Sequence, residues 1–246
     1  MGQLDGRVCL VTGAGRGIGA AIATAFVQAG AEVVLTDIHK ESVEAHAAAL
    51  GQSAHVHDVA DEAAWIQIVG AVAARFNRLD VLVNNAGYGW LKPVVDTPLA
   101  EWRRLMAVNV DGTFLGMKHA IPLIEQTGGG AIVNMSSMYG KVGNAGTAAY
   151  CASKGAVTLM TKAVALECAE RRNGIRVNSI HPGYVQTPSV GEALSPAQIE
   201  QLRKLHPIGR IADPAEIARA VVFLASEDAS FMTGAELVVD GGFTAQ

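Results

Sequence analysis

Three side chains in the middle of the chain have types and spacing suited to proton transfer. Tyr150 and Lys154 are four residues apart, and Ser137 lies thirteen residues before Tyr150. If this segment is helical, Tyr150 and Lys154 lie on one face. A free tyrosine titrates near pH ~10, and a nearby cation would lower that pKa and make the phenol usable for proton transfer to or from an alcohol. The alternative is an amphipathic tyrosine beside a solvated lysine, so a second signal is needed.

The second signal is a glycine-rich turn near the start of the chain. An apolar run, Val8–Thr12, leads to the glycines of residues 13–19 and then to an apolar stretch that ends at Gly30. This order indicates strand, turn and helix, in which glycine lets the backbone approach a pyrophosphate and the helix N-terminus offers free N–H groups. A second apolar run ends at Asp37, about 20 residues beyond the turn, where a carboxylate would bind ribose hydroxyls. The alternative for Asp37 is a helix N-cap before residues 39–50.

The elements that must position these residues follow a regular alternation. Apolar runs separated by stretches of helix length indicate a parallel sheet covered on both faces. The expected strands are Val8–Thr12, Val33–Asp37, Ala54–Asp58, Leu79–Asn84, Ala131–Ser136, Ile175–His181 and Leu237–Val239. The fold class is therefore α/β, a Rossmann-type doubly wound sheet of about seven parallel strands in a single domain spanning residues 1–246.

A set of motifs in the same order resembles the short-chain dehydrogenase/reductase family over essentially the whole chain. The motifs are Thr12-Gly13-x-x-x-Gly17-x-Gly19, Asn84-Asn85-Ala86-Gly87, Asn109, Ser137, Tyr150, Lys154 and Pro182-Gly183. Within the family, the chain is most similar to bacterial secondary-alcohol, hydroxysteroid and cyclic-alcohol dehydrogenases.

The resemblance implies a role for each matching residue. Tyr150 would be the general base in alcohol oxidation and the general acid in ketone reduction, and Lys154 would depress its pKa and hold the nicotinamide ribose. Ser137, rather than its neighbour Ser136, would bind the substrate oxygen, and Asn109 would act through a water connected to Lys154. The residues implied to hold the dinucleotide are Gly13, Arg16, Gly17, Ile18, Gly19, Asp37, Asp58, Val59, Asn85, Ala86, Gly87, Tyr150, Lys154, Pro182, Gly183, Val185 and Thr187.

Charge predicts which dinucleotide binds. A carboxylate at Asp37 accepts hydrogen bonds from ribose hydroxyls but repels a 2′-phosphate. Ile38 offers no compensating cation, and Arg16 in the glycine turn is the one cation that would favour NADP. The sequence therefore predicts NAD.

The candidate substrate pocket is mostly apolar. It comprises Trp90, Met138, Tyr139, Val142, Tyr184 and Val190. Because these residues include no cluster of cations for a phosphate or carboxylate, we expect interconversion of apolar secondary alcohols and ketones, with cyclic or steroid-like compounds as candidates. One alternative is a 3-oxoacyl-carrier-protein reductase, which Asp37 disfavours because those enzymes mostly use NADPH. Another is a non-catalytic dinucleotide-sensing protein, which would have no need of the Tyr150–Lys154 pair.

Two segments depart from the regular alternation. Residues 188–207 contain Gly191 and Pro196 and are predicted to form a loop with a short helix, which the resemblance implies is a substrate lid. The predicted helix Ala149–Ala169 is apolar nearly all round, so it needs burial on more than one side. One side can pack on the sheet and the other on a second subunit, and the resemblance implies a homo-oligomer, most often a tetramer.

Composition excludes several other classes of protein. The chain has 246 residues and a formal net charge of −4, with mixed signs that argue against nucleic acid as a partner. No apolar run reaches the about 18 residues of a membrane span. The cysteines (Cys9, Cys151 and Cys168) and the seven histidines have no metal-ligand spacing. We therefore predict no metal site, and reduced thiols in a cytoplasmic protein.

Overall fold

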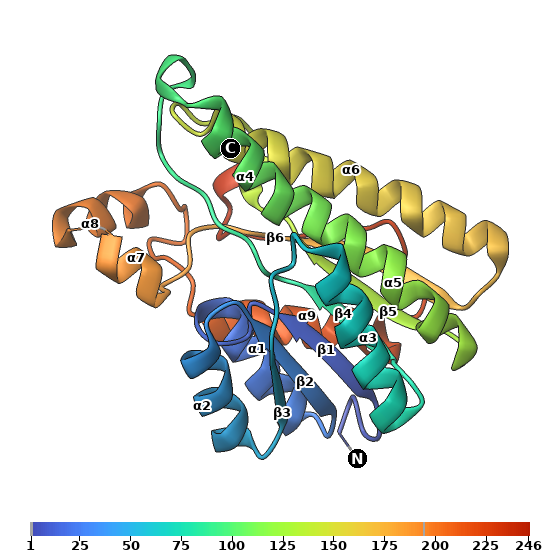
Figure 1. The fold of residues 1–246 in the computed structure, drawn as a ribbon. Helices are drawn as coiled ribbons and strands as arrows, with labels where there is room; N and C mark the ends of the chain where they lie inside the picture. The colour runs from blue at the N-terminus through green and yellow to red at the C-terminus, as the bar shows by residue number, and fades with distance from the viewer. Residues whose placement is uncertain (1, 194) are drawn as a thin grey trace.

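A single sheet of parallel strands forms the centre of the computed structural model, which describes residues 2–193 and 195–246. The strands lie in the order β3-β2-β1-β4-β5-β6-β7 (Figure 1). They are β1 (Val8–Thr12), β2 (Glu32–Asp37), β3 (Ser53–Val56), β4 (Val81–Asn84), β5 (Gly130–Met135), β6 (Ile175–Pro182) and β7 (Glu236–Val239). The seven predicted strands are confirmed, and none of their ends differs by more than two residues.

Helices cover both faces of this sheet. The helices of the main body are α1 (Gly17–Gln28), α2 (Lys40–Leu50), α3 (Glu62–Phe76), α4 (Leu99–Met106), α5 (Gly112–Gln126), α6 (Ala148–Arg171) and α9 (Pro214–Ala225). Helices α1, α2 and α9 contribute to one apolar core, and α3, α5 and α6 contribute to the other. Strand β1 serves both, because Cys9 and Val11 point into the first core and Val8 and Leu10 into the second. The predicted doubly covered α/β sheet is confirmed.

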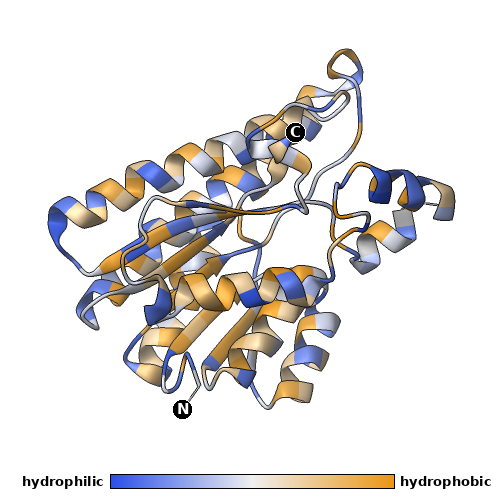
Figure 2. Ribbon diagram, turned by 180° about the vertical axis from the view of Figure 1, so that it is seen from behind, coloured by the Kyte–Doolittle hydropathy of each residue, from blue (hydrophilic) through white to orange (hydrophobic). Residues whose placement is uncertain are grey.

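The central strands are largely apolar, and they appear mostly orange in Figure 2. This pattern is typical of parallel strands that are buried on both faces. Strand β1 is buried at every position, and so is β4. Among the described residues, no helix is both long enough and apolar enough to cross a bilayer.

The region expected to form a lid contains two short helices rather than one. They are α7 (Pro188–Ala193) and α8 (Pro196–Lys204), and both project beyond the main body in Figure 1. Helix α8 begins with a capping box: the Ser195 side chain accepts the Gln198 backbone N–H, and the Gln198 side chain accepts the Ser195 backbone N–H. Pro196 occupies the first helical position. Leu194, also within the predicted lid, lies outside the described residues.

The strand order places the ends of β1 and β4 side by side. Strand β1 pairs with β2 on one side and β4 on the other, so the direction in which the chain adds strands reverses there. In open α/β sheets, ligands bind outside the carboxyl ends of the strands at such a point. The glycine turn follows the carboxyl end of β1, and Ser137 follows the carboxyl end of β5, which is the neighbour of β4. Both therefore lie at the carboxyl edge of the sheet.

Candidate active site

The glycine turn after β1 is held against the loop after β4. The Thr12 hydroxyl accepts the backbone N–H groups of Asn85 and Ala86, both at 3.0 Å. The Asn85 amide donates to the carbonyls of Thr12 (2.8 Å) and Gly13 (3.1 Å). A Cβ on Gly19 would lie 2.1 Å from the Gly13 carbonyl, so only glycine allows helix α1 to approach the turn this closely. Asn85 and Ala86 thus shape the turn as well as lying where the cofactor was predicted.

The turn has the features of a pyrophosphate site. Gly13 and Gly17 have positive φ angles of 64° and 60°. No side chain caps the N-terminus of α1 at Arg16, so its first N–H groups stay available to a ligand. A Cβ on Gly17 would lie 3.4 Å from the Thr187 side chain, so the segment after β6 reaches the same turn. These residues fit a bound dinucleotide.

Asp37 ends β2 beside the turn and is only 8% exposed. One carboxylate oxygen accepts the Gly15 N–H and the other accepts the His39 N–H, each at 3.0 Å. The N-cap of α2 is His39, so Asp37 is not the helix cap that was its alternative role. The carboxylate therefore has a fixed orientation at the carboxyl end of β2, where an adenosine ribose would lie.

The other predicted cofactor residues line the same edge of the sheet. Asp58 and Val59 follow β3, the former exposed and the latter buried, and Pro182 is the last residue of β6. Val185 is buried and forms an isolated bridge with Ala212. Ile18 and Gly183 are half-buried.

The three residues first singled out in the sequence lie together. Ser137 follows β5, Tyr150 and Lys154 lie in the first turns of α6, and the Ser137 side chain is close enough to the Tyr150 phenol to influence its pKa. The Lys154 Nζ lies 5.8 Å from the centre of the Tyr150 ring. The neighbouring Ser136 is engaged elsewhere, because its hydroxyl donates to the Lys154 carbonyl (3.0 Å) and contacts the Thr158 hydroxyl. Of the two serines, Ser137 is therefore the one available to a substrate.

Lys154 is buried, and a backbone carbonyl holds its ammonium group in place. Its ammonium donates to the Met135 carbonyl at the end of β5 (2.7 Å). A Cβ on Gly87 would lie 3.3 Å from that ammonium and 3.0 Å from the Asn109 side-chain oxygen. Glycine at residue 87 therefore lets the loop after β4 pass between Lys154 and Asn109 without displacing either side chain.

Asn109 lies in a π-helical turn (Ala107–Asp111) that joins α4 to α5. Its side chain is fully buried, donates to the Tyr88 carbonyl (2.9 Å) and to the Ser153 hydroxyl (3.0 Å), and accepts the Tyr88 N–H (3.1 Å). These contacts pin the loop that follows Gly87 beside α6. Widened turns of this kind are frequent at functional sites.

The predicted lowering of the Tyr150 pKa is not found. Burial raises the pKa of Tyr150, and the neighbouring Ser137 side chain opposes that rise without reversing it. Burial also lowers the pKa of Lys154 to about 8. The helical spacing was correct, but it carries no information about burial, and desolvation opposes ionisation of the phenol and of the amine alike.

Three residues of the site were missed by sequence reasoning. Ser153 holds Asn109, and Met135 holds Lys154 through its carbonyl. His181 donates from Nδ1 to the Ser137 carbonyl (3.0 Å), while its Nε2 pairs with the Ser179 hydroxyl (2.9 Å). His181 is fully buried at the end of β6, and the apolar pattern around it gave no sign of a partner.

The predicted substrate residues lie on several segments of this edge of the molecule. Met138 and Tyr139 form a buried turn directly after Ser137, and Tyr184 lies in the loop after β6 with its hydroxyl 3.1 Å from that of Tyr139. Trp90 packs against Tyr88 in the loop after β4. Val142 is 36% exposed, and Val190 is half-buried in α7.

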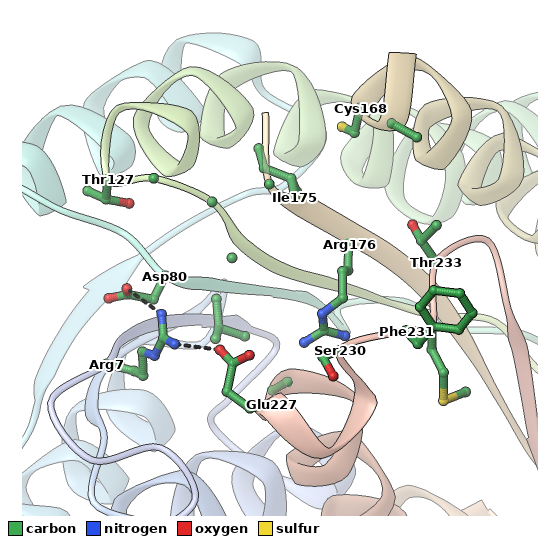
Figure 3. Close-up of a pocket in the computed structure, with 18 of the residues that line it drawn as sticks. Arg7, Asp80, Thr127, Cys168, Ile175, Arg176, Glu227, Ser230, Phe231 and Thr233 are labelled. Atoms are coloured by element: carbon green, nitrogen blue, oxygen red, sulfur yellow. Dashed lines mark hydrogen bonds and ion pairs between the residues drawn. The ribbon is translucent and has the colours of Figure 1, made fainter. Parts of the chain in front are cut away.

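A well-defined cavity lies at the opposite edge of the sheet. It has a volume of about 620 Å³ and opens at the amino ends of β4, β5 and β6, beside Arg7, Asp80 and Arg176 (Figure 3). Arg7 pairs there with Asp80 (3.2 Å) and Glu227 (2.7 Å). Because Ser137 follows the carboxyl end of β5, this cavity is separate from the group around Tyr150.

Comparison with known proteins gives a consistent result. Residues 13–244 match the family described as "Enoyl-(Acyl carrier protein) reductase". The chain is 43% identical over 249 residues to an NADP-dependent (R)-specific alcohol dehydrogenase of Lentilactobacillus kefiri, with 99% of both chains covered. It is 45% identical over 251 residues to a cyclopentanol dehydrogenase of Comamonas sp., covering both completely. It is 45% identical over 247 residues to a D-threitol dehydrogenase of Mycolicibacterium smegmatis, covering 98% of this chain and 94% of that one.

The chain belongs to the short-chain dehydrogenase/reductase family. It is therefore an oxidoreductase that uses a nicotinamide dinucleotide, as its sequence motifs predicted.

Proposed function

We propose that this protein is an NAD-dependent dehydrogenase that interconverts secondary alcohols and ketones. The observation that supports this proposal most strongly is the meeting of Ser137, Tyr150 and Lys154 at the edge of the sheet that holds the glycine turn. The dinucleotide supplies or accepts the hydride. The side chains position the substrate and move the proton.

The proton steps follow from the contacts. The Ser137 hydroxyl and the Tyr150 phenol would both hydrogen-bond the substrate oxygen, fixing the reacting carbon. Because burial raises the pKa of Tyr150, the phenol holds its proton at neutral pH and is ready to donate it to a ketone oxygen. Alcohol oxidation needs the reverse transfer, so the phenol must first release its proton to solvent before it can accept the proton of the alcohol. Lys154, with a pKa of about 8, remains mostly protonated at pH 7 and can stabilise negative charge on Tyr150 and bind ribose hydroxyls.

The preference for NAD rests on Asp37. Its buried carboxylate can accept hydrogen bonds from ribose hydroxyls but would repel a 2′-phosphate. Arg16 is the competing cation, and its guanidinium lies 3.7 Å from the Glu192 carboxylate on α7. A cation already paired with a carboxylate attracts a phosphate less. The L. kefiri relative is NADP-dependent, so the preference needs direct measurement.

The substrate class rests on the pocket and on the relatives. The apolar Met138 directly follows Ser137, and Trp90 follows Gly89, at which an added Cβ would lie 2.5 Å from the Tyr150 ring. Cyclopentanol and D-threitol, named in two of the relatives, both contain secondary alcohols. We therefore favour a small cyclic or short-chain secondary alcohol, and an acyl-carrier-protein thioester remains the second candidate because of the matching family description.

We also propose that the protein works as a homotetramer. Helix α6 buries Val157 and Ala165 against the rest of the chain, yet Leu159 and Leu166 on it are 69% and 65% exposed. Phe114 of α5 is 49% exposed. Apolar side chains left exposed on two long helices support burial against another subunit. A monomer or a dimer in light scattering at micromolar concentration would refute the tetramer.

Substitution of the phenol tests the central assignment. Tyr150→Phe should retain dinucleotide affinity and lose at least ~10²-fold in kcat, the lower range for general acid–base catalysis. Tyr88→Phe is the matched control, since it removes a phenol hydroxyl from the loop after β4. Rates would be measured over aliphatic, aryl, cyclic and steroidal alcohols and an acyl thioester. A Tyr150→Phe enzyme with near-parental turnover would refute the assignment.

A further inference from the structure

Two phenol hydroxyls meet beside the reacting group. Tyr139 comes from the turn after Ser137 and Tyr184 from the loop after β6, and their oxygen atoms are 3.1 Å apart. The rings are edge to face, with centres 6.1 Å apart and planes at 84°. We call these two side chains the hydroxyl pair.

The hydroxyl pair lies close to the site of proton transfer. The Tyr139 backbone N–H donates to the Ser137 hydroxyl oxygen (3.2 Å), so the turn that holds Tyr139 is fastened to the residue expected to bind the substrate oxygen. Tyr184 lies three residues after His181, whose Nδ1 donates to the Ser137 carbonyl (3.0 Å), so the second tyrosine also comes from a segment that contacts Ser137. A substrate held by Ser137 and Tyr150 therefore has the hydroxyl pair as a neighbour.

Other aromatic rings hold the hydroxyl pair in place. Tyr139 packs edge to face on Phe243, with ring centres 6.0 Å apart, and Tyr184 packs edge to face on His206 at 5.8 Å. His206 accepts the Tyr184 N–H at Nε2 (3.1 Å) and donates from Nδ1 to the Leu202 carbonyl at the end of α8 (2.9 Å). The pair is therefore preorganised and is tied to the predicted lid.

The hydroxyl pair has hydrogen-bonding capacity to spare. Two hydroxyls carry two protons, and their mutual hydrogen bond uses one of them. Across residues 2–193 and 195–246, neither oxygen has a second hydrogen-bond partner in the protein. Because burial raises the pKa of Tyr139 far above its usual value, this phenol stays neutral. A neutral donor with free lone pairs suits a hydroxyl or carbonyl oxygen rather than a charged group.

We propose that the hydroxyl pair binds a second oxygen of the substrate. The preferred substrates would then be diols in alcohol oxidation and hydroxyketones in ketone reduction, with the second oxygen on a carbon close to the reacting one. This inference rests on the proposed function, because it assumes that the reacting oxygen lies at Ser137 and Tyr150.

The expected preference is moderate, and the structure explains why. When a simple alcohol binds, the two hydroxyls remain bonded to each other, so neither is left unpaired and the simple alcohol is not strongly rejected. A diol adds one hydrogen bond between neutral groups. We expect about a tenfold preference in kcat/KM, which corresponds to about 1.4 kcal/mol.

Matched substrates test the inference on the parent enzyme. The value of kcat/KM for a vicinal cyclopentanediol would be compared with that for cyclopentanol, and with that for the monomethyl ether of the diol. The diol should be favoured about tenfold, and the ether should lie between the two because it accepts but cannot donate. An active enzyme that used the diol no better than cyclopentanol would overturn the inference. Failure to turn over any secondary alcohol would instead refute the proposed function.

Substitutions then locate the effect. Tyr184→Phe and Tyr139→Phe should each reduce the ratio of diol to cyclopentanol kcat/KM towards one, whatever the absolute rate. Tyr88→Phe, which removes a phenol outside the hydroxyl pair, should retain the parental ratio. A ratio that survived in both hydroxyl-pair variants would assign the pair to fold stability alone and overturn the inference. If either variant fails to fold, the three substrates on the parent enzyme decide the question.

Discussion

The cofactor preference is the prediction most directly linked to one side chain. Replacing Asp37 with Asn removes the negative charge while keeping the size of the side chain. In the parent protein the carboxylate is 8% exposed and held by the N–H groups of Gly15 and His39. It cannot swing away from a phosphate without losing both hydrogen bonds. The repulsion between the Asp37 carboxylate and a 2′-phosphate should therefore weaken the binding of NADP.

The size of the repulsion between the Asp37 carboxylate and a 2′-phosphate can be estimated from Coulomb's law. Two unit charges about 4 Å apart near a protein surface interact by about 4 kcal/mol. Partial access of solvent reduces this value, so we expect at least about 2.8 kcal/mol, or ~100-fold in favour of NAD in kcat/KM. Asp37→Asn should narrow the gap at least ~10-fold, and Asp37→Gly should act in the same direction.

The assay is kcat/KM for NAD and NADP with one alcohol substrate held at a fixed concentration. Glu32→Gln is a suitable control because it removes a carboxylate from the opposite end of the same strand, β2. It should leave the NAD to NADP ratio unchanged. Equal values for the two cofactors on the parent enzyme, or a preference for NADP, would mean that Arg16 outweighs Asp37 and would refute this reasoning.

Three further predictions concern other parts of the molecule. Lys154→Ala should weaken dinucleotide binding as well as turnover, and an unchanged Kd would remove its role at the ribose. Burial lowers the pKa of His57 to about 4. As the pH falls below 6.5, this histidine is therefore protonated in the unfolded state while it is still neutral in the folded state. The free energy of unfolding measured in urea should then fall by up to about 3 kcal/mol by pH 4. His57→Phe keeps an aromatic ring against Trp65 and should reduce this dependence of stability on pH. The double substitution Leu159→Lys and Leu166→Lys should place charges in the proposed subunit contact and lower the molecular mass measured by light scattering. Lys162→Ala, a substitution on the same helix, should leave the mass unchanged.

Strands such as β1 and β4 could be predicted from sequence because each is a short run of mostly apolar residues. Strand β1 is buried at every position, and Val8–Thr12 has the same bounds in the prediction and in the structure. The prediction was less accurate at β3, where Ala54–Asp58 was expected and Ser53–Val56 is observed. This edge strand is only partly buried, so hydropathy does not fix where it ends.

Ser137, Tyr150 and Lys154 could be predicted as a group because they are close in sequence and match motifs of a known family. The hydroxyl pair could not be found in this way, since Tyr139 and Tyr184 are 45 positions apart and meet only after β5 and β6 pair. The π-helical turn around Asn109 was equally hidden, because no residue in Ala107–Asp111 distinguishes it from ordinary helix. Such arrangements depend on tertiary contacts that a local pattern does not contain.

Lys154 shows why position and environment must be considered separately. The sequence predicted where this residue lies, but not that it would be buried with the Met135 carbonyl as its hydrogen-bond acceptor. Burial that lowers its pKa to about 8 also destabilises the folded protein at pH 7, by up to about 3 kcal/mol. That cost should disappear as the pH rises from about 8 towards the pKa of the unfolded lysine, because the folded state then holds the neutral amine. An apolar residue at this position would avoid the cost, so stability does not account for a lysine here, and a function that needs its charge does.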